Sequence, residues 1–487
     1  MPIAFDNIPT TLRVPFAYIE FNNSNAQQGP SVQPYKSLMF GQKLAAGTAT
    51  VEEIIQISDD AQAATLFGFG SMLHRMVRTY RKNDKVTPLF VIAQDDDGSA
   101  VAAAETLTFS GPATADGTLS VYIGGTKVSI AVSSGDTADE MAAALDVAIN
   151  AIQDLLVTST VATNVVTATA RNKGLVGNEI DYRTNLFDDD VVPAGVGVAF
   201  AQSVAGATNP DLTASIAALP SDQYNFIAMP YLDTANLLLL KAELDDRFGP
   251  IEQTDGRAVA ANNDTFGNLT TFGEARNDKH LTVIDALGPT PAFAWAAAYQ
   301  AQLAKAAQAD PARPFQTLEL ADVYAESKSE EFTHAERNSL LFSGVSTHKV
   351  APGGVPVIER AITTYRLNTA GGSDTSYLNV NTLTTLSFIR YDFRTSILNK
   401  YPRHKLANDG TNFGVGQVVM TPSQGRAFAL EKFDQWELAG YVEGREQFKR
   451  DLIVERNAAD VDRLDFLLPP DLINQFRISG TQVQFLL

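Results

Sequence analysis

Residues 224–248 read YNFIAMPYLDTANLLLLKAELDDRF, and this stretch decides the class of fold that the sequence predicts. Its opening, YNFIAMP, is a continuous apolar run typical of a buried strand, and TANLLLLKAELDDRF is typical of a helix. Two further strands, GRAVAAN and HLTVIDA, and a long Ala-rich helix, PAFAWAAAYQAQLAKAAQA, follow in order. Because strands and helices alternate, we predict a parallel, doubly wound α/β sheet within residues 206–345.

On the N-terminal side of this zone, residues 98–205 change in composition and are dominated by Ala, Gly, Thr, Ser and Val. Short strand-like runs such as ETLTFSG, GTLSVYIGG and NVVTATAR surround one helix that opens with Thr137. Glu140 stands three residues after Thr137, which is the spacing of a capping box. We therefore expect a small β-rich domain with one packed helix, inserted between two parts of the body.

The outer zones are residues 1–97 and 346–487. The first of them holds two strands, SLMFGQ and TPLFVIAQ, and a helix around GSMLHRMVRTYRKN, and it stops at the turn-rich QDDDGSA. A chain of 487 residues is too long for one core, so two to four domains are expected. The predicted fold class is a multidomain α/β and α+β protein with extended arms at both ends.

Both chain ends show the period-two pattern of a half-buried strand. At the C-terminus the pattern lies in RISGTQVQFLL, and at the N-terminus in TLRVPFAYIEF, where Pro15 cannot donate to a ladder and predicts an edge strand or a free arm. Exposed strands of this kind recruit other chains. Each arm therefore pairs either with its own subunit or with another copy, and the pattern alone leaves both open. The apolar arm positions are Leu12, Val14, Phe16, Tyr18, Val483, Phe485 and Leu487.

Composition excludes several classes of function. The net charge of −19 argues against direct binding of nucleic acid, which requires clustered Lys and Arg. The chain has no cysteine, so thiolate chemistry and disulfides are excluded. No apolar run approaches the ~20 residues needed to span a bilayer, and the first residues lack the pattern of a secretory signal. We expect a soluble protein made in a cytoplasm, without stable membrane insertion.

A search for catalytic motifs finds none, so we predict no catalytic residue, no cofactor and no metal site. The loop after the first strand of the α/β zone, MPYLDTAN, has no glycine and cannot form a phosphate-binding loop. In GFGSM the serine is misplaced for a nucleophile elbow, and Ser71 is better placed as a helix N-cap. The five histidines are dispersed, and the acidic runs DDDG and FDDDVV lack the ligand alternation of a calcium loop.

The densest basic cluster, NKYPRHKLANDG, contains Lys400, Arg403 and Lys405. It is either a surface loop after a helix or a contact for an acidic protein, such as a neighbouring subunit. Taken with the missing catalytic motifs and the two unpaired arms, the sequence favours a structural subunit over an enzyme.

Several long stretches resemble one known family. IPTTLRVPFAYIEFNNS, FGFGSMLHRMVRTYRKN, DGTLSVYIGGTKVSIAVSSGDT, NKGLVGNEIDYR, DPARPFQTLEL, IERAITTYRLN, YPRHKLANDG and PPDLINQF occur in this order along nearly the whole chain. On these stretches the sequence resembles the contractile tail sheath proteins of Mu-like bacteriophages.

The resemblance implies an assembly rather than an enzyme. Subunits of this family form six-fold rings stacked helically around a rigid tail tube, and contraction drives the tube through the host cell envelope for genome ejection. The implied core is built from both chain ends, with the other domains inserted and projecting outward, and both arms add strands to neighbouring subunits. The implied partners are further copies of the chain, the tail tube protein, and the baseplate and tail terminator proteins, in a virion tail assembled in the host cytoplasm.

During contraction the arms must stay docked, so the segments that join them to the body are expected to act as hinges. The candidates are Gly29 and Pro30 in the N-terminal linker, and Ser479 and Gly480 before the C-terminal arm. Three alternatives remain: the sheath of a headless contractile particle, an enzyme using the α/β zone, and an adhesin or tail-fibre module suggested by the β-rich zone.

Overall fold

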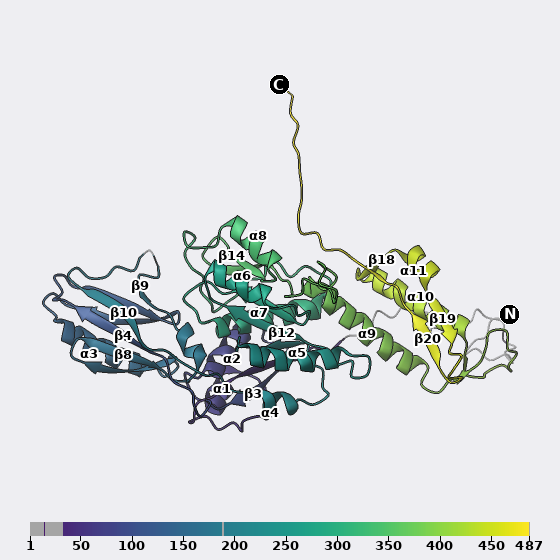
Figure 1. Cartoon of the computed structure of the whole chain (residues 1–487), viewed down its shortest axis with the longest axis horizontal. Coiled ribbons are helices and arrows are strands. Elements are labelled where there is room, and N and C mark those ends of the chain that lie inside the picture. Colours follow the sequence, from purple (N-terminus) through teal and green to yellow (C-terminus); the bar gives the residue numbers. More distant parts are fainter. Residues whose placement is uncertain (1–13, 15–32, 188, 487) are drawn as a thin grey trace. The chain divides into compact units, whose positions relative to one another are not determined.

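The computed structural model describes residues 14, 33–187 and 189–486 of the chain (Figure 1). The described residues form two compact units, one of residues 33–388 with 474–486 and one of residues 389–473. The chain passes from the first unit to the second within helix α9 (Val380–Lys400). Residues 346–388, which composition placed in the C-terminal zone, therefore belong with the first unit.

The first unit is built on a six-stranded sheet with the strand order β13-β12-β11-β1-β3-β2. All neighbouring strands in it are parallel except β2, which pairs antiparallel with β3 at one edge. The central strands β11 and β1 are buried along their length, as the continuous apolar runs of the sequence predict. The strands are β1 (Ser37–Gln42), β2 (Ile54–Ile57), β3 (Leu89–Gln94), β11 (Phe226–Ala228), β12 (Arg257–Asn262) and β13 (Leu281–Asp285).

The sheet takes strands from two parts of the chain that we expected to lie in different domains. We expected the α/β sheet to lie within residues 206–345 and residues 1–97 to belong to a separate core, but β1 pairs with β3 on one side and β11 on the other. The partner of Ser37 in β11 is Phe226. Pairing between parallel strands so far apart in sequence leaves no local signal, because each strand only has to present an apolar run of the right length.

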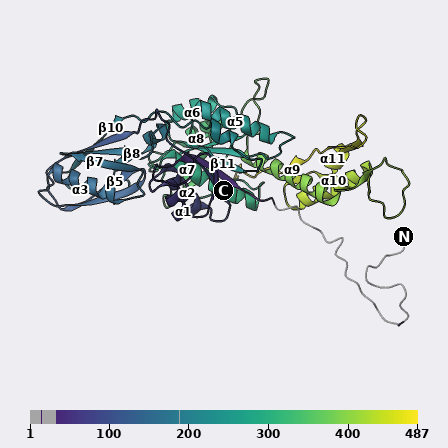
Figure 2. The ribbon, with the colours of Figure 1, turned by 90° about the horizontal axis from the view of Figure 1, so that it is seen from below.

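Helices α2 (Met72–Asn83) and α7 (Ala292–Ala309) lie side by side and pack against the sheet at β1 (Figure 2). The N-cap predicted at Ser71 is confirmed, because its Oγ accepts a hydrogen bond from the His74 N–H at 3.1 Å. The other helices of this body are α1 (Asp60–Phe67), α4 (Thr213–Ala217), α5 (Thr234–Phe248), α6 (Phe266–Glu274) and α8 (His334–Phe342).

The β-rich zone projects from one side of this body (Figure 1). It contains a four-stranded sheet, β10-β4-β8-β7, a three-stranded sheet, β6-β5-β9, and helix α3 (Ala138–Ala151) packed on the strands. Thr137 and Glu140 form the predicted capping box. The strands are β4 (Ala104–Ser110), β5 (Gly117–Ile123), β6 (Thr126–Val132), β7 (Val157–Ala162), β8 (Val165–Ala170), β9 (Tyr182–Thr184) and β10 (Gly197–Val204).

The hairpin β14 (Thr347–Val350) and β15 (Pro356–Arg360) completes the first unit. In the second unit, helices α10 (Pro422–Leu438) and α11 (Arg445–Asp451) pack with three two-stranded sheets around an aromatic core that includes Phe433 stacked on Phe448. The paired strands are β16 (Lys405–Leu406) with β17 (Val419–Met420), β18 (Val442–Glu443) with β21 (Asp471–Leu472), and β19 (Ile453–Arg456) with β20 (Leu464–Leu467).

Candidate assembly interface

The C-terminal segment, residues 474–486, exposes apolar side chains. Phe485 is 77% exposed and Leu486 fully exposed, and Val483 is 79% exposed. Figure 1 draws the end of the chain as an extended segment with no ribbon beside it. Burying such side chains is worth about 1.5–3 kcal/mol each. Burial of these side chains against an apolar surface would therefore favour binding of the segment to that surface.

No strand is assigned to residues 473–486, so the expected C-terminal strand has no partner in the described part of the chain. Ladder hydrogen bonds need a second strand, and residues 33–187 and 189–486 provide none beside this segment. The hinge candidates Ser479 and Gly480 are exposed, and no atom lies within 4 Å of a Cβ placed on Gly480. Of the N-terminal arm only Val14 is described, and it is 68% exposed. The remaining arm and hinge candidates, Leu12, Phe16, Tyr18, Gly29, Pro30 and Leu487, lie outside the described residues.

The second unit offers strand edges that sequence reasoning did not single out. Each of its sheets has two strands, so each strand is paired on one side only. The hairpin β19–β20 also exposes apolar side chains, with Ile453 at 51% and Leu467 at 57%. Strands with one unpaired edge accept further strands. The short apolar run of Leu452, Ile453 and Val454 in LIVERN was the available signal for this surface.

This hairpin is seated closely on α10 through Gly425. A Cβ added to Gly425 would lie 2.9 Å from Leu464 Cδ2 and 3.1 Å from Val454 Cγ1. The absence of a side chain at this position therefore lets the helix support the hairpin from one face, while the strand edges stay available.

The basic cluster predicted as a contact is partly occupied within its own unit. Lys400 Nζ forms an ion pair with Glu431 at 2.7 Å, and Lys405 Nζ donates to Gln417 Oε1 at 2.7 Å. Arg403 is exposed in the turn between α9 and β16.

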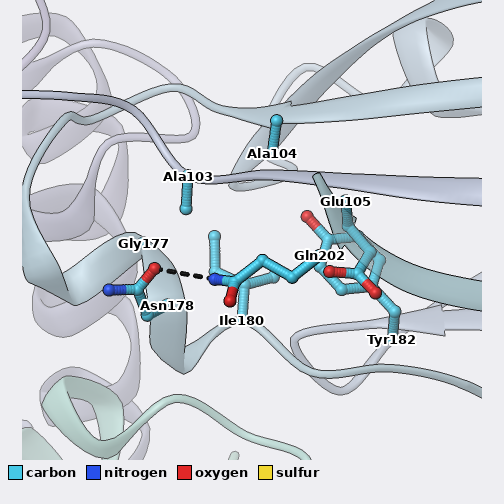
Figure 3. A pocket seen from close by; sticks show the side chains of 8 residues that line it. All are labelled: Ala103, Ala104, Glu105, Gly177, Asn178, Ile180, Tyr182 and Gln202. Carbon is cyan, nitrogen blue, oxygen red and sulfur yellow. Dashed lines mark hydrogen bonds between the residues drawn. The ribbon is translucent and has the colours of Figure 1, made fainter. Parts of the chain in front are cut away.

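A cavity of about 220 Å³ in the β-rich zone was not foreseen from the sequence (Figure 3). Glu105, Asn178, Tyr182 and Gln202 line it, and burial raises the pKa of both Glu105 and Tyr182. The Asn178 amide is already used, since its Oδ1 accepts from Gln202 Nε2 at 2.9 Å and its Nδ2 donates to the Gly206 carbonyl at 3.0 Å. The lining contains no paired acid and base or activated nucleophile, so the cavity has no catalytic geometry.

In the ranges that the structure covers, no group of three or more His, Asp or Glu side chains is arranged to hold a metal ion. Within the same ranges, none of the helices has the length and apolar character required to cross a membrane.

Comparisons with known proteins place the chain in one family. Residues 205–364 match the phage tail sheath protein central domain, and residues 372–485 match the phage tail sheath C-terminal domain. The chain is 44% identical over 488 residues to the Mu-like prophage FluMu tail sheath protein of Haemophilus influenzae, with each chain covered completely.

Solved structures were also compared. A sheath tail protein of Desulfitobacterium hafniense is 14% identical, with 94% of this chain and 100% of that chain covered and a TM-score of 0.47. A sheath tail protein of Listeria innocua is 12% identical, with coverage of 91% and 93% and a TM-score of 0.49.

Proposed function

Because the chain belongs to the phage tail sheath protein family, we propose that it is a structural subunit that polymerises as helically stacked six-fold rings around a tail tube. Contraction of this sheath drives the tube through the host cell envelope for genome ejection. The partners are further copies of the chain, the tube protein, and the baseplate and tail terminator proteins. The subunits assemble in the host cytoplasm and remain in the virion tail.

One observation carries the proposed mode of assembly: the C-terminal segment is apolar, exposed and without a strand partner among the described residues of its own chain. In the sheath, residues 481–487 add a strand to an open edge of a two-stranded sheet in the 389–473 unit of a neighbouring copy. The apolar side chains decide whether the segment docks, and the ladder sets its register. The N-terminal arm, with Leu12, Val14, Phe16 and Tyr18, acts in the same way, so that the core of the lattice is made from both chain ends.

Each copy is then held at several points, and links of modest strength accumulate through their effective concentration. The links must survive rotation of the subunits during contraction. Ser479 and Gly480 serve as the hinge on the C-terminal side, which is supported by their exposure and by the open space around Gly480. Gly29 and Pro30 serve on the N-terminal side. Of the basic residues, Lys400, Arg403 and Lys405, the exposed Arg403 is the best placed to contact the tube or a neighbour.

Deleting residues 481–487 tests the strand exchange. The truncated chain should fold with an unchanged thermal midpoint, because the segment contacts little of its own unit, and should form no normal sheaths in negative-stain images. Replacing Val483 and Phe485 together by Ser should have the same effect without shortening the chain. The matched control replaces Gln482 and Gln484 by Ala. Normal contractile sheaths from the truncated chain would show that the segment does not link the copies.

A further inference from the structure

Two arginines meet where the C-terminal segment leaves the first unit. Arg360 ends β15, and Arg477 lies in the segment, and both side chains are half-buried. Arg477 Nη2 donates to Asn381 Oδ1 at 3.0 Å and to Gln475 Oε1 at 3.3 Å. Arg360 Nη2 donates to Asn379 Oδ1 at 3.4 Å. The hydrogen-bond acceptors around both guanidinium groups are therefore neutral amides.

The surroundings of these groups are electrostatically unfavourable. Burial lowers the pKa of Arg477 to about 10, and the charge of Arg360 contributes to the lowering. Burial also lowers the pKa of Arg360. Arg477 Nη1 and Arg360 Nε are buried without a hydrogen-bond partner, and no carboxylate of the described chain forms an ion pair with either residue.

Two other partly buried arginines of the same unit each face a carboxylate. Arg183 Nη2 lies 2.7 Å from Glu326 Oε1, and Arg337 Nε lies 2.9 Å from Glu359 Oε2. A guanidinium group carries a planar set of donors that matches a carboxylate, and leaving a partly desolvated charge unpaired is costly. Arg360 and Arg477 thus provide the hydrogen-bond donors and the positive charge that an anion-binding site needs, while no carboxylate of the described residues neutralises them.

We propose that a carboxylate from a second copy of the chain binds between Arg360 and Arg477 when copies assemble. This inference rests on the proposed sheath function. Two features favour a second copy as the source. Arg477 lies just before the exposed residues that we assign to the crossing between subunits, and the chain carries 56 Asp and Glu against 37 Lys and Arg. Binding of this carboxylate would hold Arg477, and with it the start of the exposed segment, in place only when a neighbouring copy is present.

The test compares Arg360→Gln and Arg477→Gln with the wild-type chain, with Arg313→Gln, an exposed arginine nearby, as the control. In the dilute, unassembled chain each variant of the pair should keep or raise the thermal midpoint, because it removes repulsion between like charges. In assembly, measured by sedimentation, each should raise the critical concentration by roughly tenfold or more, as expected for lost hydrogen bonds to a charged group. The control should assemble as the wild type does.

Unchanged assembly of both variants would overturn the inference while leaving the sheath function intact. So would a density map of the wild-type sheath in which both guanidinium groups face solvent or a carboxylate of their own chain. If phosphate raises the thermal midpoint of the unassembled wild-type chain but not of the variants, and assembly is unaffected, the site binds a free anion instead. A wild-type chain that never polymerises would overturn the proposed function as well.

Discussion

At the scale of single residues, Asp322 holds several cations of helix α2 in place. Its carboxylate lies 3.3 Å from Arg75 Nη1 and accepts a hydrogen bond from Thr79 Oγ1 at 2.8 Å, and Lys82 approaches it from the same helix. Arg75 is only 6% exposed. Burial is the largest single influence and opposes ionisation of Asp322, but the charges of Arg75 and Lys82 and the hydrogen bonds from Lys82 and Thr79 together outweigh it, so the pKa of Asp322 is lowered.

Replacing Asp322 by Asn should destabilise the first unit by about 3–5 kcal/mol at pH 7, because Arg75 would remain buried without its counter-charge. Asn keeps the size of the side chain and tolerates the positive φ of 66° at this position. A carboxyl with a lowered pKa stabilises the fold above its unfolded pKa of about 3.9, and this term is lost as the pH falls through the folded pKa. The gap between the two proteins in urea unfolding should therefore shrink in acid. A gap that is independent of pH would contradict the assignment.

His280 gives a prediction of the opposite kind, because it is fully buried as a neutral ring. Burial and the charges of Arg257 and Lys279 lower the pKa of His280 to about 3. The unfolded chain binds a proton near pH 6.5 and the folded chain does not, so stability should fall as the pH drops from about 6.5 toward 3.

For the same reason the NMR signals of the His280 ring should not titrate between about pH 5 and 8. A midpoint for His280 near that of an exposed histidine would show that the ring is charged in the fold.

At the scale of elements, the seating of the β19–β20 hairpin on α10 can be tested at Gly425. Gly425→Ala would bring a methyl group within 2.9 Å of Leu464 Cδ2 and 3.1 Å of Val454 Cγ1, so these side chains are pushed away from the helix together with the hairpin that carries them. Overpacking of this kind costs about 1–3 kcal/mol. We expect a lower thermal midpoint and a further loss of assembly, since the displaced hairpin carries a proposed acceptor edge.

The matched control is Gly414→Ala, because no atom lies within 4 Å of a Cβ placed there. If Gly425→Ala lowers the midpoint but assembles normally, the β19–β20 edge is not an acceptor.

The elements also show what could be read from the sequence. The strand at residues 37–42, the capping box of Thr137 and Glu140 and the helix over residues 234–248 were predictable, because each depends on residues close together in the chain. The pairing of β1 with β11 was not, since Ser37 and Phe226 share no local pattern. The same limit applies to the Arg360 and Arg477 pair, whose members are brought together only by the fold.

At the scale of the whole molecule, negative charge is unevenly distributed. Residues 389–473 contain 12 Lys and Arg and 13 Asp and Glu, for a net charge of −1, whereas the whole chain carries −19. Nearly all of the excess charge therefore lies outside the unit that holds the open strand edges. Like charges on the larger remainder keep separate copies soluble and oppose their association.

This distribution predicts how assembly responds to salt. The screening length falls from about 30 Å at 0.01 M to about 8 Å at 0.15 M ionic strength, so repulsion between the acidic parts of neighbouring copies weakens across this range. The apolar docking of residues 481–487 does not weaken, because its strength comes from burial. The critical concentration for sheath formation, measured by sedimentation, should therefore fall as salt rises over this interval.

The chain without residues 481–487 should stay unassembled at each salt concentration, since screening removes repulsion but supplies no link. A critical concentration that rises with salt from the lowest value would mean that attraction between charged groups of neighbouring copies, beyond the contact proposed at Arg360 and Arg477, outweighs the repulsion between their acidic parts.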